Sequence, residues 1–159
     1  GFDAGIRFLE QVPEDMIAVP IGGPHRSVCV ATPGYLATHG TPLHPNDLTR
    51  HECIRFRFPS GRIYKWEFER GGRKLDVDVP GRLTFADFRL SLDMALTGVG
   101  LTFVLEDQVT DLILEGRLVR VLEDWCPSYP GFMLYYPRQR RVTSALRAFI
   151  DLIRDSHGD

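Results

Sequence analysis

Two short apolar segments, far apart in the chain, constrain its fold more than any other feature. The first, residues 25–42, reads HRSVCVATPGYLATHGTP and predicts a strand that runs directly into a helix started by Pro33. Proline suits the first turn of a helix, where its missing N–H would have no partner in any case. The second segment, residues 98–104, reads GVGLTFV and predicts another strand of this kind. A chain that leaves one lobe and later returns to it builds a cleft.

The composition is that of an ordinary folded protein without a charge excess. The chain has 159 residues, 43% of them hydrophobic, which suffices for one domain or two small lobes. Nineteen Lys and Arg residues face 21 Asp and Glu residues, so the formal net charge is −2. A protein that binds DNA by itself usually carries a clear basic excess, and this chain alone is therefore a poor candidate for that function.

Neither a disulfide framework nor a membrane segment is predicted. Cys29, Cys53 and Cys126 are widely spaced and form no CxxC pair, which indicates reduced and mostly buried thiols. The first residues lack the basic start and apolar core of a signal peptide, and no apolar run approaches membrane-spanning length. We therefore expect a cytoplasmic protein with no membrane partner.

Short strands and helices alternate along the chain. Apolar and polar residues alternate at 2–8 and 53–58, and Gly71-Gly72 separates runs 65–70 and 73–79 as in a tight hairpin. Further strands are predicted at 16–21, 27–31, 101–104, 117–122 and 132–136, and helices at 34–38, 88–99, near 109–113 and after Thr143. This order predicts an α/β fold.

The sequence Thr84-Phe85-Ala86-Asp87 matches a capping box for the helix at 88–99. In this interpretation Thr84 is the N-cap, and the Asp87 side chain accepts a hydrogen bond from the backbone N–H of Thr84. Thr143 is predicted to cap the last helix. In this helix, Leu146, Phe149, Ile150 and Ile153 fall on one apolar stripe.

Five segments, taken in order and spacing, resemble one known family. They are FDAGIR at 2–7, VATPGYLATHGTP at 30–42, CIRFRFPSGRIYKWEF at 53–68, GVGLTFV at 98–104 and GRLVRVLEDW at 116–125. Together they resemble the second half of the effector-binding domain of LysR-type transcriptional regulators. The winged helix-turn-helix of that family, and the first strand-helix-strand-helix portion of its first lobe, have no counterpart in this chain.

The resemblance implies a two-lobed α/β fold of the periplasmic-binding-protein-like type 2 class. Residues 1–25 and 105–159 would form part of lobe I, and residues 26–104 would form lobe II with hinge strands at 26–31 and 100–104. A small effector would bind between the lobes and change their angle. Promoter DNA would be contacted only through the absent N-terminal domain, in a homodimer or homotetramer. An incomplete first lobe would expose apolar faces and unpaired backbone groups, which favours pairing with another chain.

No enzyme signature is present in the sequence. There is no GxSxG motif, no glycine-rich phosphate loop and no HExxH motif, because Arg55 stands where the second histidine of the last would fall. The four histidines near turns, His25, His39, His44 and His51, are typical of surface positions. We predict no catalytic residue, no metal site and no cofactor.

The loop after the strand at 53–58 is the first candidate ligand site. Ligand sites of α/β proteins favour the carboxyl ends of strands, and the Ser60 hydroxyl with the backbone around Gly61 could hold a carboxylate or carbonyl group. Phe58 would form an adjacent pocket wall. An ordinary Pro-Ser-Gly turn is the alternative, and the family resemblance favours the ligand site.

Four further residues complete the candidate set. Arg7 ends the first strand, where the resemblance places the effector pocket, and an arginine can bind a carboxylate through two hydrogen bonds. Phe85 and Asp87 would line the cleft at the start of the helix at 88–99, although capping is the simpler role for Asp87. Thr102 lies on the second predicted hinge strand. A solvated charge is the alternative for Arg7.

The leading hypothesis is a non-enzymatic sensor of a small molecule, such as a small carboxylate or an aromatic acid. A periplasmic solute-binding protein of a transporter shares the predicted architecture and is the first alternative. A small hydrolase or transferase that uses Cys126 or a histidine is the second.

Overall fold

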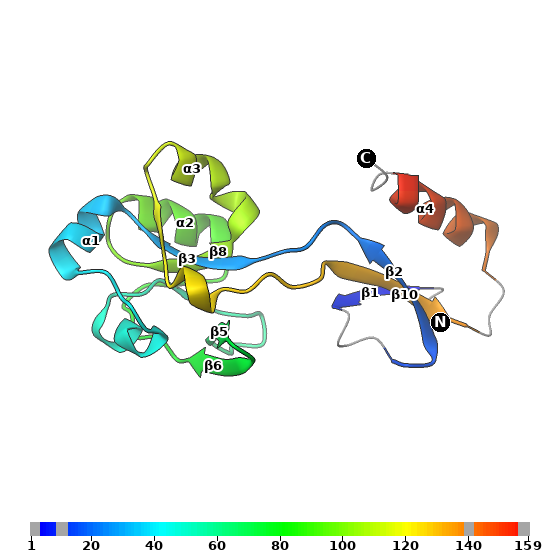
Figure 1. Ribbon diagram of the computed structural model, residues 1–159, viewed down its shortest axis with the longest axis horizontal. Coiled ribbons are helices and arrows are strands. Elements are labelled where there is room, and N and C mark those ends of the chain that lie inside the picture. The colour runs from blue at the N-terminus through cyan, green and yellow to red at the C-terminus, as the bar shows by residue number, and fades with distance from the viewer. Residues whose placement is uncertain (1–3, 9–12, 139–141, 156–159) are drawn as a thin grey trace. The chain divides into compact units, whose positions relative to one another are not determined.

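The computed structural model describes residues 4–8, 13–138 and 142–155, and it divides into two compact units. Unit 1 comprises Gly1–His25 and Tyr129–Asp159, and unit 2 comprises Arg26–Ser128 (Figure 1). Within the described residues, no helix has the length and apolar character needed to cross a bilayer.

Unit 1 is a three-stranded antiparallel sheet with a helix on one face. Its strands lie in the order β1 (Gly5–Phe8), β10 (Phe132–Pro137) and β2 (Met16–Ile21). Helix α4 (Ser144–Asp155) buries Ile150 and Ile153 against the sheet residues Val19 and Leu134. The alternation of apolar residues in the strands explains why one sheet face forms this core.

The start of α4 confirms the predicted cap. The Thr143 hydroxyl accepts a hydrogen bond from the backbone N–H of Leu146 at 3.3 Å. The predicted apolar stripe is only partly buried, because Phe149 is 45% exposed while Ile150 and Ile153 are buried.

Unit 2 is built around β3 (Ser27–Ala31), which pairs with two antiparallel strands, β8 (Thr102–Leu105) and β9 (Val119–Val121). Strands β4 (Arg55–Phe56) and β7 (Thr84–Phe85) form a parallel pair. A parallel bridge between Cys53 and Leu101 joins this pair to the β8 side of the sheet.

The predicted hairpin is confirmed as β5 (Trp66–Arg70) and β6 (Arg73–Val77). Its turn residues Gly71 and Gly72 have φ angles of 58° and 77°, which glycine adopts without the steric cost of a Cβ atom. The helical segments of unit 2 are α1 (Pro33–His39), η2 (Pro45–Arg50), α2 (Phe88–Leu96), η3 (Glu106–Gln108), α3 (Thr110–Leu114) and η4 (Glu123–Trp125).

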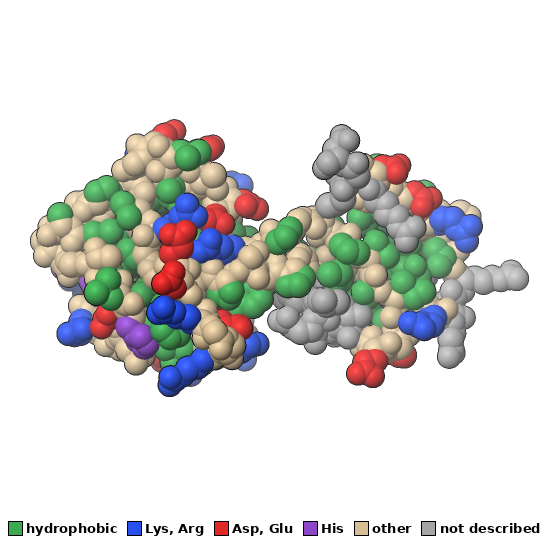
Figure 2. All heavy atoms as spheres, in the orientation of Figure 1, with side chains coloured by type: hydrophobic (Ala, Val, Ile, Leu, Met, Phe, Trp, Pro, Cys, Tyr) green, Lys and Arg blue, Asp and Glu red, His purple; other side chains and the backbone are tan. Residues whose placement is uncertain are grey.

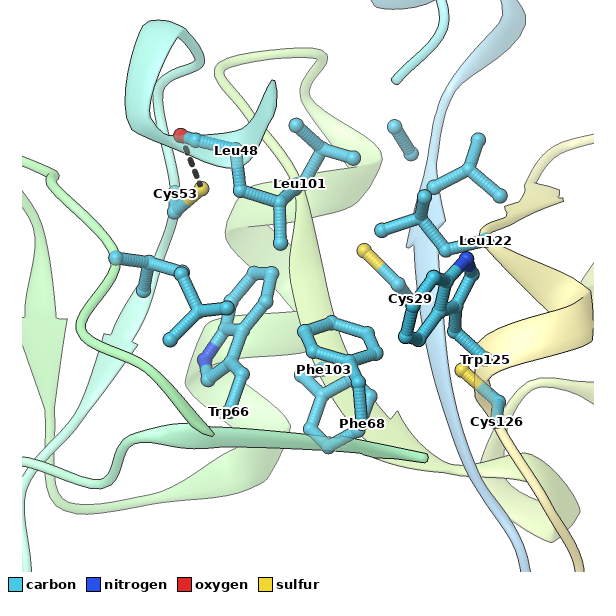
Figure 3. Packing of buried hydrophobic residues seen from close by; sticks show 14 of the residues in the cluster. Cys29, Leu48, Cys53, Trp66, Phe68, Leu101, Phe103, Leu122, Trp125 and Cys126 are labelled. Atoms are coloured by element: carbon cyan, nitrogen blue, oxygen red, sulfur yellow. Dashed lines mark hydrogen bonds between the residues drawn. The ribbon is translucent and has the colours of Figure 1, made fainter. Parts of the chain in front are cut away.

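The central strands of unit 2 separate two hydrophobic clusters. On one face, Cys29, Leu101 and Phe103 pack with the hairpin residues Trp66 and Phe68 (Figure 3). On the other face, Val28, Val30 and Val104 pack with residues that include Val109, Leu118, Leu92 and Leu96. Helices α2 and α3 lie on this second side, opposite the hairpin (Figure 1).

The boundary between the units differs from the prediction. Residues 105–128, expected in lobe I, belong to unit 2, because β9 pairs with β3 and because Val109 and Leu118 are buried beneath the sheet. The two segments predicted as hinge strands, 26–31 and 100–104, both lie inside unit 2. The chain instead changes unit at residues 25–26 and 128–129. There His25 and Tyr129 exchange two backbone hydrogen bonds of 3.0 and 2.8 Å.

Charged side chains of unit 2 form a network that begins at Arg26, where the chain enters unit 2. Arg26 lies 3.9 Å from Glu106 and 3.8 Å from Glu123, and Arg120 contacts the same two carboxylates. Figure 2 shows acidic and basic side chains side by side on this face of unit 2. The network ties the start of β3 to the segments after β8 and β9.

Candidate ligand-binding site

Parallel pairing brings the carboxyl ends of three strands to one edge of unit 2. Strand β4 is parallel to β7, and the Cys53 bridge to Leu101 is parallel as well. The backbone N–H of Arg57 continues the pairing by donating to the carbonyl oxygen of Phe85 at 2.8 Å. The loop after β4 and the start of α2 after β7 therefore share the edge at which β8 ends, which is where α/β proteins favour ligands.

The loop after β4 is a tight turn with an exposed tip. Its base is an antiparallel bridge between Arg57 and Ile63, and the Phe58 N–H donates to the Arg62 carbonyl at 2.9 Å. Gly61 has φ of 85° and donates its N–H to the Phe58 carbonyl at 2.8 Å. Ser60 is exposed, and its hydroxyl has no hydrogen-bond partner among the residues that the structure describes. This hydroxyl is thus available to a ligand.

The start of α2 corrects the predicted capping box. Thr84 lies in β7, and Asp87 is the N-cap, accepting a hydrogen bond from the Arg89 N–H at 2.7 Å. The Asp87 carbonyl also accepts from the Ser91 hydroxyl at 3.2 Å. Because a carboxylate already occupies the positive end of the helix dipole, this terminus is a poor site for the acidic group of a ligand.

Four aromatic rings form a continuous surface at this edge, which we call the aromatic wall: Phe56, Phe58, Tyr64 and Phe88. Phe56 and Phe88 stack with centroids 3.9 Å apart and planes 5° from parallel. Phe58 stands nearly perpendicular to Phe56 and to Tyr64, at 5.3 and 5.7 Å. Of these four residues, only Phe58 was predicted from the sequence to face a ligand. The position of Phe88, one residue after a helix cap at a strand end, was the signal that could have identified a second member.

Two other predicted residues differ in their accessibility. Phe85 is half-buried and pairs with Phe56 across the parallel strands. Thr102 pairs with Val30 and is only 1% exposed. Leu101 and Phe103, its neighbours in the chain, point to the opposite face of the sheet. The Thr102 side chain therefore lies on the same face as Val104, which is covered by α2. A ligand at the strand edge would not reach this buried hydroxyl.

The structure therefore gathers five of the predicted residues at one edge of unit 2. These are Phe58, Ser60, Gly61, Phe85 and Asp87. Arg7 belongs to β1 in unit 1, and its side chain lies outside the described part of the chain. A separate open depression of about 380 Å³ lies beside α1 and contains none of the predicted residues; it is lined by Thr32, Gly34, Tyr35, Thr38, His39, Leu96, Thr97 and Gly98.

The three cysteines are placed in the core rather than at this edge. Cys29, Cys53 and Cys126 belong to the cluster of Trp66 and Phe103 (Figure 3). Burial raises the pKa of Cys29 well above its usual value, raises the pKa of Cys53 to about 12, and raises the pKa of Cys126. All three are therefore protonated thiols near neutral pH, which opposes a role of Cys126 as a nucleophile. Among the described residues, no group of three or more His, Cys, Asp and Glu could hold a metal ion.

A partly buried hydrogen-bond chain connects α1 to the segment before β4. The Tyr35 hydroxyl accepts from the Glu52 N–H at 3.0 Å and lies 3.1 Å from Nδ1 of His51. Because its oxygen already accepts a hydrogen bond, the hydroxyl can donate its own proton to a neutral His51. Burial, and then the charge of nearby His39, lower the pKa of His51.

This arrangement predicts a pH-dependent contribution to stability. Unfolded His51 takes up a proton at pH ~6.5, whereas folded His51 does so only at lower pH. The contribution of His51 to stability is therefore complete above pH ~6.5 and is lost as the pH falls through the pKa of the folded state. We expect the urea midpoint to fall less between pH 8 and pH 5 in His51→Gln than in the original chain, because glutamine accepts the hydrogen bond without titrating. An identical pH dependence in both proteins would contradict this role of His51.

Comparisons with known proteins identify the family to which the sequence is similar. The sequence matches the family described as LysR substrate binding domain over residues 1–158. The uncharacterized HTH-type transcriptional regulator YcaN of Escherichia coli is 41% identical over 154 residues, which cover 97% of this chain and 50% of YcaN. The regulator PgrR of the same organism is 37% identical, over 96% of this chain and 52% of PgrR. This chain thus spans about half the length of these relatives.

A solved structure shows the same fold. The regulatory domain of AphB in Vibrio vulnificus aligns with a TM-score of 0.77 at 25% sequence identity, over 97% of this chain and 75% of that domain.

Proposed function

This chain belongs to the LysR substrate binding domain family, and we propose that it senses a small effector on behalf of a DNA-binding regulator. The observation that carries the proposal is the edge of unit 2, where an exposed serine turn, a capped helix start and an aromatic surface meet within a domain of this family. Relatives named as transcriptional regulators support the regulatory role.

The other properties of the intact regulator follow from this proposal. DNA contact would come from a separate domain, since the net charge of this chain is −2 and its relatives are about twice its length. A bacterial protein that acts on promoter DNA works in the cytoplasm, and the relatives are bacterial. Family resemblance favours a homodimer or homotetramer. Sensing requires no catalysis, and the raised thiol pKa values support a non-enzymatic domain.

The physical basis of sensing is a shift between conformations of the regulator. An effector changes such an equilibrium only if it binds one conformation more tightly than the other. A shift from 1% to 99% of the active form needs a difference in affinity of about 10⁴-fold. The two places where the chain changes unit, residues 25–26 and 128–129, are the natural positions for such a change.

The proposal is tested with the intact regulator bound to DNA from its own promoter region. We expect at least one metabolite from a chemically diverse set to alter promoter affinity or footprint at sub-millimolar concentration, without being consumed. A regulator whose DNA binding responds to none of them, or a metabolite that is converted to product, would overturn it.

Ser60→Ala is expected to weaken binding of that metabolite about fivefold, because the substitution removes one hydrogen bond of about 1 kcal/mol. The affinity for promoter DNA without the metabolite should not change. Isothermal titration measures the first quantity and a DNA-binding assay the second. Ser144→Ala, at an exposed serine at the start of α4, is the matched control and should bind the metabolite normally. Equal affinity in both variants would remove Ser60 from the site.

A further inference from the structure

One ring of the aromatic wall, that of Phe88, is exposed to solvent, and the other three are half-buried. Trp66 and Phe68 are each 1% exposed and Phe103 is 5% exposed, which is normal for core residues. Phe88, by contrast, is 37% exposed although it stacks on Phe56. Large apolar rings that remain accessible at a strand edge are typical of a surface that binds something apolar.

The rings of the wall are held in place from behind. Tyr64 lies 6.3 Å from Phe103, and Phe103 in turn stacks on Trp66 at 5.5 Å. The wall is therefore an extension of the rigid core rather than a set of loose surface side chains. Rings fixed in advance lose little conformational entropy when a ligand binds, so their contacts contribute efficiently to affinity.

The orientation of the rings suits a flat partner. Phe58 is turned 86° from Phe56 and 79° from Tyr64, so the wall presents both ring faces and ring edges. Aromatic pairs prefer edge-to-face and offset stacked arrangements, and a ligand ring can adopt one or the other against such a surface. A saturated ring of similar size lacks the π-system that makes these geometries favourable.

Charged and polar groups of both kinds flank the wall. The Ser60 hydroxyl lies on the exposed turn, and the Asp87 carboxylate caps α2. Exposed arginines adjoin the wall residues in the chain, namely Arg57, Arg62 and Arg89. Because charges of both signs are available, unit 2 does not fix the charge of a ligand, and the ring surface is the feature that indicates its chemical class.

We propose that the effector carries a planar aromatic ring, which stacks on the aromatic wall through Phe58 and Phe88. This inference rests on the proposed function, since it names the chemical class of the molecule sensed at the same edge. The charge of the effector is not part of the proposal.

The test compares aromatic probes with their saturated counterparts on the intact regulator. The pairs are phenylacetate with cyclohexylacetate, and 2-phenylethylamine with 2-cyclohexylethylamine, measured by ligand-observed NMR titration. In at least one pair the aromatic probe should bind about two- to tenfold more tightly than the saturated one. Phe58→Leu and Phe88→Leu keep an apolar side chain but remove a ring, so each should reduce that preference.

The control is Phe149→Leu, at a 45% exposed phenylalanine of α4 in unit 1, which should keep the full preference. Fluorescence of the two tryptophans, Trp66 and Trp125, verifies that unit 2 of each variant is folded. Equal binding of aromatic and saturated probes, absence of saturable binding by both aromatic probes, or an unchanged preference in both wall variants would overturn the inference.

Failure of this inference differs from failure of the proposed function. If a non-aromatic metabolite changes promoter binding, and Ser60→Ala weakens that response while Phe58→Leu does not, the sensing function stands and the ring preference is wrong. If no metabolite changes promoter binding, the proposed function itself fails.

Discussion

Gly81→Ala is expected to destabilise unit 2 by about 3 kcal/mol, since overpacking against backbone is combined with the loss of hydrogen bonds. A Cβ atom at Gly81 would lie 1.7 Å from the carbonyl oxygen of Cys53, which is far inside van der Waals contact. The obstacle is backbone and cannot rotate away. The segments must separate, which would break the hydrogen bonds from Cys53 N–H to Pro80 and from Arg55 N–H to Leu83.

Urea unfolding followed by tryptophan fluorescence measures this loss, because both tryptophans of the chain lie in unit 2. Gly34→Ala is the matched control, since a Cβ atom at Gly34 meets nothing within 4 Å and the residue lies in α1. Alanine there should stabilise the protein by up to about 1 kcal/mol through its higher helix propensity. An unfolding midpoint for Gly81→Ala equal to that of the original chain would show that residues 80–83 do not lie against residues 52–55.

Leu101→Ala is expected to lower the free energy of unfolding by about 2–5 kcal/mol. The loss should fall in the upper part of this range. Leu101 is fully buried in the cluster of Figure 3, where it lies next to Leu48. Its backbone is held by hydrogen bonds with Glu52 and Ile54, at 2.9 and 2.8 Å. The surrounding residues can therefore move only slightly into the space left by the side chain. A cavity remains, and it destabilises the fold.

Leu114→Ala provides the same chemical change at an exposed position of unit 2. Leu114 ends α3 and is 81% exposed, so its truncation should alter stability by less than about 0.5 kcal/mol. Both variants are measured by the same tryptophan-monitored unfolding. A similar loss in the two variants would mean that Leu101 is not buried in the core.

Local features of the fold were predictable because nearby residues decide them. The hairpin turn requires two residues with positive φ, and Gly71-Gly72 supplies both. The cap of α4 depends only on the hydroxyl of Thr143 and the N–H of Leu146, three residues later. The family resemblance, which depends on the order of short segments, was confirmed by the match over residues 1–158.

Features that depend on distant pairing were predicted incompletely. Thr84 has the chemistry of a helix cap, but pairing of β7 with β4 holds it in a strand and leaves the cap to Asp87. The strand around residues 119–121 was predicted, but its partner β3 was not, and this pairing moves the boundary of unit 2 to Ser128.

In the candidate site, too, the features set by neighbouring residues were predictable and those set by distant contacts were not. Ser60 and Phe58 were predicted because a polar turn after an alternating strand is visible in a short stretch of sequence. The role of Phe88 was not visible, because its ring meets Phe56 only after β4 and β7 pair and α2 folds.

The sequence alone determined the α/β class, most of the elements, the family and the loop that carries Ser60, because these depend on local patterns of residue size, polarity and backbone freedom. It also singled out residues 25–42, at the start of which the chain passes from unit 1 to unit 2. Only the tertiary structure decided where the chain returns, which face of the sheet buries Thr102, and which rings join in the aromatic wall. The physical reason is that contacts between distant segments depend on strand pairing and packing, which residue spacing along the chain does not specify.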